Sequence, residues 1–160
     1  WGTTIDYALY NKLHNRWYSG LNFKSKLTSK SQVPFSMQQS LGYTDYLRSY
    51  EYFVINGQHY AIAHAFLKYE LMPERIVKIE KFKWNKFNKI PYSFYLNIFT
   101  DAGYVIDNYQ DPNNNLANKL LISAGIGLDF ITYYDQILRF EYSFSKYGVS
   151  RFYLHIGKVF

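Results

Sequence analysis

The sequence predicts an all-β chain whose strands cross a membrane as part of an antiparallel barrel. Apolar and polar residues alternate along most of the 160 residues, which places neighbouring side chains on opposite faces of extended strands. Several alternating runs exceed ten residues, whereas soluble strands average about 5–6 residues and membrane strands need about 9–11. Aromatic residues make up 21% of the chain, and aromatic side chains favour strands.

The first three predicted strands span residues 3–11, 16–28 and 59–72. In each, apolar side chains recur at every second position, and polar or small residues occupy most positions between them. The apolar faces consist of Ile5, Tyr7 and Leu9 in the first strand, Trp17, Leu21, Phe23 and Leu27 in the second, and Ala61, Ala63, Ala65, Leu67, Tyr69 and Leu71 in the third.

Four further strands are predicted at residues 92–106, 118–133, 136–145 and 151–160. They alternate in the same way, and most of the connections between them are short and rich in turn-forming residues. Their apolar faces include Phe94, Leu96 and Ile98 in the first, Ile122, Ala124, Ile126, Leu128 and Phe130 in the second, Leu138, Phe140, Tyr142 and Phe144 in the third, and Phe152, Leu154 and Ile156 in the last.

The two faces of these strands differ in charge. The apolar face carries no charged residue until Lys158, whereas the opposite face mixes Gly, Ser, Asn and scattered charges. A membrane barrel with a polar lumen has this pattern, and a soluble sandwich with its apolar face inward has the same alternation. The strand lengths and the aromatic content favour the membrane interpretation.

Several other function classes find little support in the composition. The chain has no Cys, which excludes disulfides and thiol catalysis, and its four His lie in no metal-binding motif. Ser123 and Ser143 lack a G-x-S-x-G context. The net charge is +6, but residues 78–89 are best interpreted as a solvated turn, and no nucleic-acid motif is present. We therefore predict no enzyme activity, catalytic residue, cofactor, metal or nucleic-acid partner.

The longest connection, at about residues 29–58, is the most informative segment. Its aromatic and apolar content indicates a loop that folds against another part of the protein. Arg48 lies among apolar neighbours, and a buried arginine needs a carboxylate partner, ideally one that accepts two parallel hydrogen bonds.

Four short segments resemble motifs of the BamA/TamA superfamily of outer-membrane proteins, also called bacterial surface antigens, in versions from Bacteroidetes-type bacteria. The segment LRSYEYFVINGQ resembles the family's VRGY/F loop motif, and FTDAG resembles its F-x-D-x-G strand motif. LISAGIGLDF and RFYLHIGKVF resemble the penultimate and closing strands. The segments occur in the family's order between residues 32 and 160.

The resemblance implies a latch for the long loop. It implies that the loop folds into the barrel lumen and that Arg48 pairs there with acidic residues, at positions matched by Asp101 and Glu70. Alternation independently places both carboxylates on the polar face. The matched motif residues are Leu47, Ser49 and Tyr50 in the loop and Phe99 and Gly103 in the strand.

One residue departs from the family motif. Ser49 stands where the family has glycine. If the position requires a positive φ, Ser49 would carry backbone strain of about 1–3 kcal/mol, and otherwise the loop tip differs in this branch.

Seven strands do not close a membrane barrel, because bacterial single-chain barrels have even strand numbers from about eight upward. The resemblance implies that residues 1–160 are the C-terminal part of a sixteen-stranded barrel, with further strands and periplasmic repeats upstream. It implies insertion of barrel proteins into the bacterial outer membrane, or translocation across it. The implied partners are the bilayer and its lipids, unfolded client proteins and accessory lipoproteins.

The resemblance implies that the closing strand forms a seam that opens sideways. Phe152, Leu154, Ile156 and Phe160 are predicted to face lipid, and Gly157, without a side chain to pack, is predicted to weaken the seam. Three alternatives remain open: a free-standing small barrel with a structural or adhesion role, a soluble ligand-binding barrel, and the membrane anchor of an upstream enzyme domain.

Overall fold

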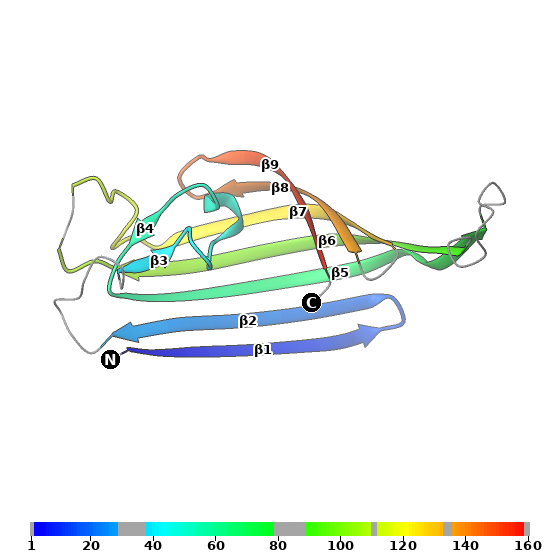
Figure 1. The fold of residues 1–160 in the computed structure, drawn as a ribbon, viewed down its shortest axis with the longest axis horizontal. Helices are drawn as coiled ribbons and strands as arrows, with labels where there is room; N and C mark the ends of the chain where they lie inside the picture. The colour runs from blue at the N-terminus through cyan, green and yellow to red at the C-terminus, as the bar shows by residue number, and fades with distance from the viewer. Residues whose placement is uncertain (1, 29–37, 79–88, 110–111, 133–135, 159–160) are drawn as a thin grey trace.

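The computed structural model describes residues 2–28, 38–78, 89–109, 112–132 and 136–158. They form one antiparallel seven-stranded sheet in the order β1-β2-β5-β6-β7-β8-β9 (Figure 1). A 3-10 helix, η2 (Arg48–Tyr50), and a two-stranded sheet of β3 (Gln39–Leu41) and β4 (Ile55–Asn56) lie within the long loop. The large sheet consists of β1 (Gly2–His14), β2 (Trp17–Thr28), β5 (His59–Lys78), β6 (Lys89–Ile106), β7 (Leu121–Thr132), β8 (Gln136–Ser145) and β9 (Ser150–Lys158).

The all-β fold and each of the seven predicted strands are confirmed, with differences at their ends. β5 and β6 are longer than predicted. Their pairing with each other continues to Lys78 and Lys89, whereas β2 pairs with β5 only as far as Tyr69. β7 starts at Leu121, later than predicted, after Asn118 with its positive φ of 58°. The short strands β3 and β4 were not predicted, because two or three residues carry no readable alternation.

The sheet is not closed into a barrel. β1 and β9 are its two edges, and within the described residues neither has a strand on its outer side. In the same part of the chain, no helix is long and apolar enough to cross a membrane.

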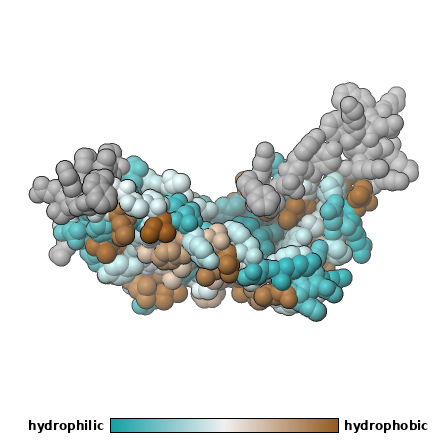
Figure 2. All heavy atoms as spheres, turned by 90° about the horizontal axis from the view of Figure 1, so that it is seen from below, coloured by the Kyte–Doolittle hydropathy of each residue, from teal (hydrophilic) through white to brown (hydrophobic). Residues whose placement is uncertain are grey.

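Burial on the two faces of the sheet is the reverse of that in soluble proteins: apolar side chains are exposed, and charged side chains are buried. On what we call the apolar face, Ile98 is 51% exposed and Ile126 is 55% exposed. On what we call the polar face, Asp101, Asp129 and Glu141 are at most 1% exposed. Figure 2 shows apolar side chains along the outer side of the curved sheet, whose other side is hollowed.

The folded loop, residues 38–58, packs on the polar face at one end of the sheet. There it forms the main apolar core with residues from β5, β6 and the segment before β7. The core consists of Leu41, Leu47, Tyr50 and Ile55 from the loop, with Tyr60, Ile62, Val105, Ala117 and Leu121 from the sheet side. The loop is therefore part of the fold.

Candidate functional site: the loop latch on the polar face

A tight turn and a short helix place Arg48 over the sheet. Gly42 has a φ of 89° and its N–H donates to the carbonyl of Asp45 at 2.8 Å. The Asp45 carboxylate contacts Lys24 Nζ at 2.7 Å and accepts a hydrogen bond from the Tyr60 hydroxyl at 2.6 Å. Leu47 is then buried in the core, and η2 begins at Arg48. The turn is thus fixed on both sides before the chain reaches Arg48.

The structure brings Arg48 and Asp101 together, and we call this pair the latch. Arg48 Nε and Nη2 donate to the two oxygens of the Asp101 carboxylate at 3.0 and 2.7 Å. The side chain of Asp101 is 0% exposed and that of Arg48 is 13% exposed. Charge-assisted bonds of this parallel geometry are among the strong ones in proteins, especially away from water.

The three residues of the F-x-D-x-G segment all contact the loop at the latch. Asp101 binds Arg48, and the guanidinium of Arg48 lies 3.8 Å from the centre of the Phe99 ring. Gly103 leaves room for Leu47, because a Cβ on Gly103 would lie 2.7 Å from Leu47 Cδ1. Alternation along β6 gives all three the same face, so the spacing of the motif is that of one contact surface.

The next strand provides the space that this arrangement needs. A Cβ on Gly125 of β7 would lie 2.6 Å from the Phe99 ring and 2.4 Å from the backbone oxygen of Tyr142. Ser123 pairs with Asp101 across β6 and β7. Gly125 of the S-x-G-x-G segment therefore leaves the space that the Phe99 ring occupies, and Ser123 lies beside Asp101 in the sheet.

Glu70 is not a partner of Arg48, which corrects the sequence interpretation. In the β5–β6 register His64 faces Asp101, and Glu70 lies six residues further along, opposite Tyr95, so that about 20 Å separates it from the latch. His64 Nδ1 lies 3.1 Å from Asp101 Oδ1. Alternation gave the correct face for Glu70 but contained no information on its position along the strand.

The second carboxylate near Arg48 belongs to Glu141 of β8. Glu141 Oε1 lies 3.6 Å from Arg48 Nη1, and its other oxygen lies 3.3 Å from His155 Nδ1. His155 Nε2 in turn contacts Glu51 of the loop at 3.0 Å. Arg139 Nε is 3.9 Å from Glu141 but only 2.7 Å from Asp129, so Asp129 is the closer partner of Arg139. The one feature of the sequence that points to a contact between Glu141 and Arg48 is that Glu141 lies on the same polar face as Asp101.

Ser49 carries no left-handed strain. Among the described non-glycine residues only Asn118 has a positive φ, and Ser49 lies in the 3-10 helix η2. Its hydroxyl donates to the carbonyl of Val149 at 3.2 Å and accepts from the Ser143 hydroxyl at 3.3 Å. The Tyr153 hydroxyl donates to the Ser49 carbonyl at 3.1 Å. Ser49 thereby connects the loop to β8, β9 and the turn between them.

Two tyrosines of the loop have raised pKa values, and of these Tyr50 is buried and Tyr46 is half-buried. Tyr50 is 2% exposed, its hydroxyl lies 3.5 Å from the carbonyl of Ile122, and burial raises its pKa. Burial also raises the pKa of Tyr46, and the carboxylates of Glu51 and Glu141 raise it further. Both hydroxyls are therefore held neutral at physiological pH.

The closing strand divides its side chains as its alternation predicts. Phe152, Leu154 and Ile156 are 63%, 54% and 74% exposed on the apolar face. On the polar face, the Tyr153 ring stacks on loop residue Tyr52 at 5.6 Å. A Cβ on Gly157 would meet nothing within 4 Å. Phe160 lies outside the described residues.

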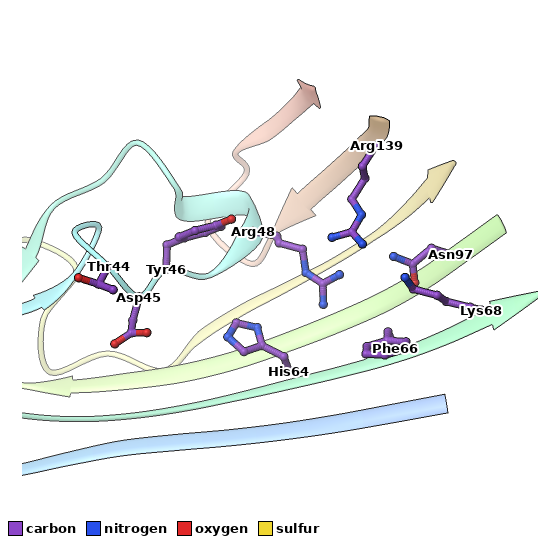
Figure 3. Close-up of a pocket in the computed structure, with 9 residues that line it drawn as sticks. All are labelled: Thr44, Asp45, Tyr46, Arg48, His64, Phe66, Lys68, Asn97 and Arg139. Atoms are coloured by element: carbon purple, nitrogen blue, oxygen red, sulfur yellow. The ribbon is translucent and has the colours of Figure 1, made fainter. Parts of the chain in front are cut away.

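A cavity of about 280 Å³ lies beside the latch (Figure 3). Figure 3 shows Arg48 reaching from the loop toward the sheet, with His64 on one side and Arg139 on the other. Behind the cavity, Asp129 binds Lys68 Nζ and Arg139 Nε at 2.7 Å each. In the described part of the chain no cluster of three or more potential metal ligands occurs. What the site shows is a set of paired charges that hold a loop against a sheet.

Comparisons of the chain with models of protein families, with curated proteins and with solved structures found no match.

Proposed function

We propose that this chain forms the C-terminal strands of a larger transmembrane β-barrel in a bacterial outer membrane. We further propose that the barrel inserts or translocates other proteins, as in the BamA/TamA superfamily. Its partners would be outer-membrane lipids, unfolded client proteins and accessory lipoproteins. The observation that carries the proposal is the reversed burial of the sheet together with the loop latched on its polar face.

The reversed burial favours a lipid environment on the apolar face. In water each exposed apolar Å² is unfavourable by about 25 cal/mol, so a continuous exposed apolar face is rare in soluble monomers. In a barrel wall the same face contacts lipid, and the polar face lines the lumen. Leu21, Ile98, Ile126, Phe144 and Leu154, from five different strands, are between 45% and 55% exposed.

The contacts between the motif segments support the family part of the proposal. Residues from the loop, β6 and β7 are far apart in sequence, yet Arg48, Phe99, Asp101, Gly103 and Gly125 meet at one place. The closing strand joins them through the bond from Tyr153 to the Ser49 carbonyl. One shared contact surface gives a physical reason for four separate motifs to occur together.

The proposed mechanism uses the outer edge of β9. β9 pairs with β8, and within the described residues its other edge has no partner. An edge strand presents unpaired backbone N–H and C=O groups, to which a client strand can add. The loop contacts β9 through Tyr153 and His155. A loop held by the latch therefore also contacts the strand that receives the client.

The small-barrel alternative requires the two edges of the sheet to pair with each other or with a further strand. A free-standing barrel needs its first and last strands to pair, and among the described residues β1 and β9 are separate edges of the sheet. The alternative of an anchor for an upstream enzyme domain has no observation in its favour.

Crosslinking tests the proposed edge. The natural chain has no Cys, so a single cysteine can be placed at Leu154, with Ile98→Cys as the control on a central strand. In outer membranes that contain a labelled client chain with a single cysteine in its incoming strand, and with an added thiol oxidant, we expect disulfide capture of the client by Leu154→Cys and not by Ile98→Cys. Equal capture by both variants, or capture by neither, would contradict strand addition at β9.

A further inference from the structure

A larger cavity, of about 650 Å³, lies on the polar face apart from the loop. Its walls come from β1, β2, β5, β6, β7 and β8, and no residue of the folded loop lines it. Tyr10 of β1 is 68% exposed, and within the described residues nothing covers the cavity on that side. The proposed function gives this cavity no role.

Four aromatic rings line the cavity in two contacting pairs. The rings of Tyr10 and Phe66 lie 6.1 Å apart, and those of Tyr18 and Tyr95 lie 6.2 Å apart in an edge-to-face arrangement. Gly20 makes the first pair possible, because a Cβ there would lie 2.3 Å from the Phe66 ring and 2.9 Å from the Tyr10 ring. The rings therefore lie close over the backbone of β2 and offer an aromatic surface to a ligand.

The lining charges of the same cavity are cationic. Lys12, Lys68 and Arg139 line it, and no acidic residue does. Beneath them, the fully buried Asp129 binds both Lys68 and Arg139. Glu70 flanks the cavity, because it pairs with Tyr95. Glu141 also lies 3.9 Å from Arg139 Nε, so Lys68 and Arg139 already have carboxylate partners beneath the cavity.

Lys12 is the cation best placed to receive a ligand. Its Nζ lies 5.6 Å from the centre of the Tyr18 ring, and within the described part of the chain it forms no ion pair. A charge held next to an aromatic surface matches a ligand that combines an apolar group with an anion.

We propose that this cavity binds an amphiphilic anion, namely an aromatic or apolar group that carries one carboxylate or phosphate. The rings of Tyr10, Phe66, Tyr18 and Tyr95 receive the apolar group, and Lys12 receives the anion. The inference goes beyond the proposed function and does not depend on it, since the cavity is present whether or not the protein assembles others.

The test is equilibrium dialysis of the protein in a zwitterionic detergent, with detergent alone as the blank. The probes are N-acetyl-phenylalanine, phenyl phosphate, the neutral N-acetyl-phenylalaninamide, and acetate, which has no ring. We expect saturable binding of at least one of the two aromatic anions, and weaker binding of both the amide and acetate. The tighter of the two aromatic anions identifies the anionic group that the site prefers.

Two variants assign the binding to the cavity. Lys12→Gln should weaken binding about threefold, as for loss of a partly exposed ion pair, and Tyr18→Leu should weaken it about fivefold through loss of ring contact. Lys146→Gln is the matched control, because Lys146 lies 5.9 Å from the Tyr147 ring outside the cavity. Equal affinity for the anion and the amide, unchanged binding by Lys12→Gln, or no saturable binding would overturn the proposal.

Discussion

The carboxylate of Asp101 accepts three hydrogen bonds from Arg48. Two come from the guanidinium, at 3.0 and 2.7 Å, and the third comes from the backbone N–H of Arg48 at 3.2 Å. Asp101 therefore holds both the side chain and the main chain of the loop at the start of η2. A single residue of β6 fixes where the loop meets the sheet.

Removal of the Arg48 side chain should release the loop. In Arg48→Ala the buried Asp101 loses its charged partner, and loss of one member of a buried pair destabilises by about 3–5 kcal/mol. We expect faster amide hydrogen exchange across residues 47–56, with β7 little affected. The control is Arg75→Ala, which changes an exposed arginine on β5. Wild-type protection of the loop in Arg48→Ala would show that the latch does not hold it.

Arg48→Lys separates charge from geometry. Lysine keeps the positive charge but cannot form two parallel hydrogen bonds or place a flat guanidinium on the Phe99 ring. We expect the rate of amide hydrogen exchange in the loop to lie between those of the wild type and Arg48→Ala, measured under the same conditions. Exchange identical to the wild type would mean that charge alone secures the loop and that the paired geometry is incidental.

Two glycines of the sheet provide a matched comparison. Gly103→Ala places a methyl group 2.7 Å from Leu47 Cδ1, whereas Gly157→Ala places one in open space. Overpacking typically destabilises by about 1–3 kcal/mol, so Gly103→Ala should lower the stability of the loop and Gly157→Ala should leave it unchanged. Denaturant titration followed by fluorescence of the aromatic residues measures both. Equal stability of the two variants would contradict the close contact at Gly103.

Two carboxylate variants test the corrected partner of Arg48. Glu141→Gln removes a charge 3.6 Å from Arg48 Nη1 and 3.3 Å from His155. Glu70→Gln removes one that is opposite Tyr95 and remote from the loop. We expect faster loop exchange only in Glu141→Gln. The reverse order would restore Glu70 as the partner of Arg48.

Ser49→Gly tests the departure from the family motif. Because Ser49 lies in a helical conformation, glycine relieves no strain there and removes the bonds with Val149 and Ser143. Each such bond contributes about 0.5–1.5 kcal/mol. We expect lower stability of the contact between the loop and β8–β9, seen as faster exchange at Tyr50 and Glu51. A more stable variant would indicate strain at Ser49 after all.

The sequence alone predicted the strands and the faces of their side chains. Alternation placed Asp101 and Glu70 on one face and Ile98 and Ile126 on the other, because successive side chains of a strand point to opposite faces. The resemblance added the pairing of Arg48 with Asp101.

The position of residues along the strands could not be predicted in this way. Whether Glu70 or Glu141 reaches Arg48 depends on the register between strands and on where the loop lies. The same holds for His64 and His155, whose contacts join residues up to 104 positions apart. The ends of β5 and β6 could not be predicted from the sequence either, since these two strands continue to pair with each other beyond the point where β2 stops pairing with β5.

The measurement that tests the central claim most directly is the environment of the apolar face in a lipid bilayer. Nitroxide labels at Ile98→Cys, Ile126→Cys and Leu154→Cys would be compared by power-saturation electron paramagnetic resonance, with oxygen as the lipid-soluble relaxant and a nickel chelate as the water-soluble one. We expect strong oxygen contact and weak nickel contact at all three positions, with a label at Lys119→Cys, next to the exposed Leu120, as the water-exposed control. Nickel contact at the three apolar positions equal to that of the control would contradict a lipid-facing sheet, and with it the proposed role in the membrane.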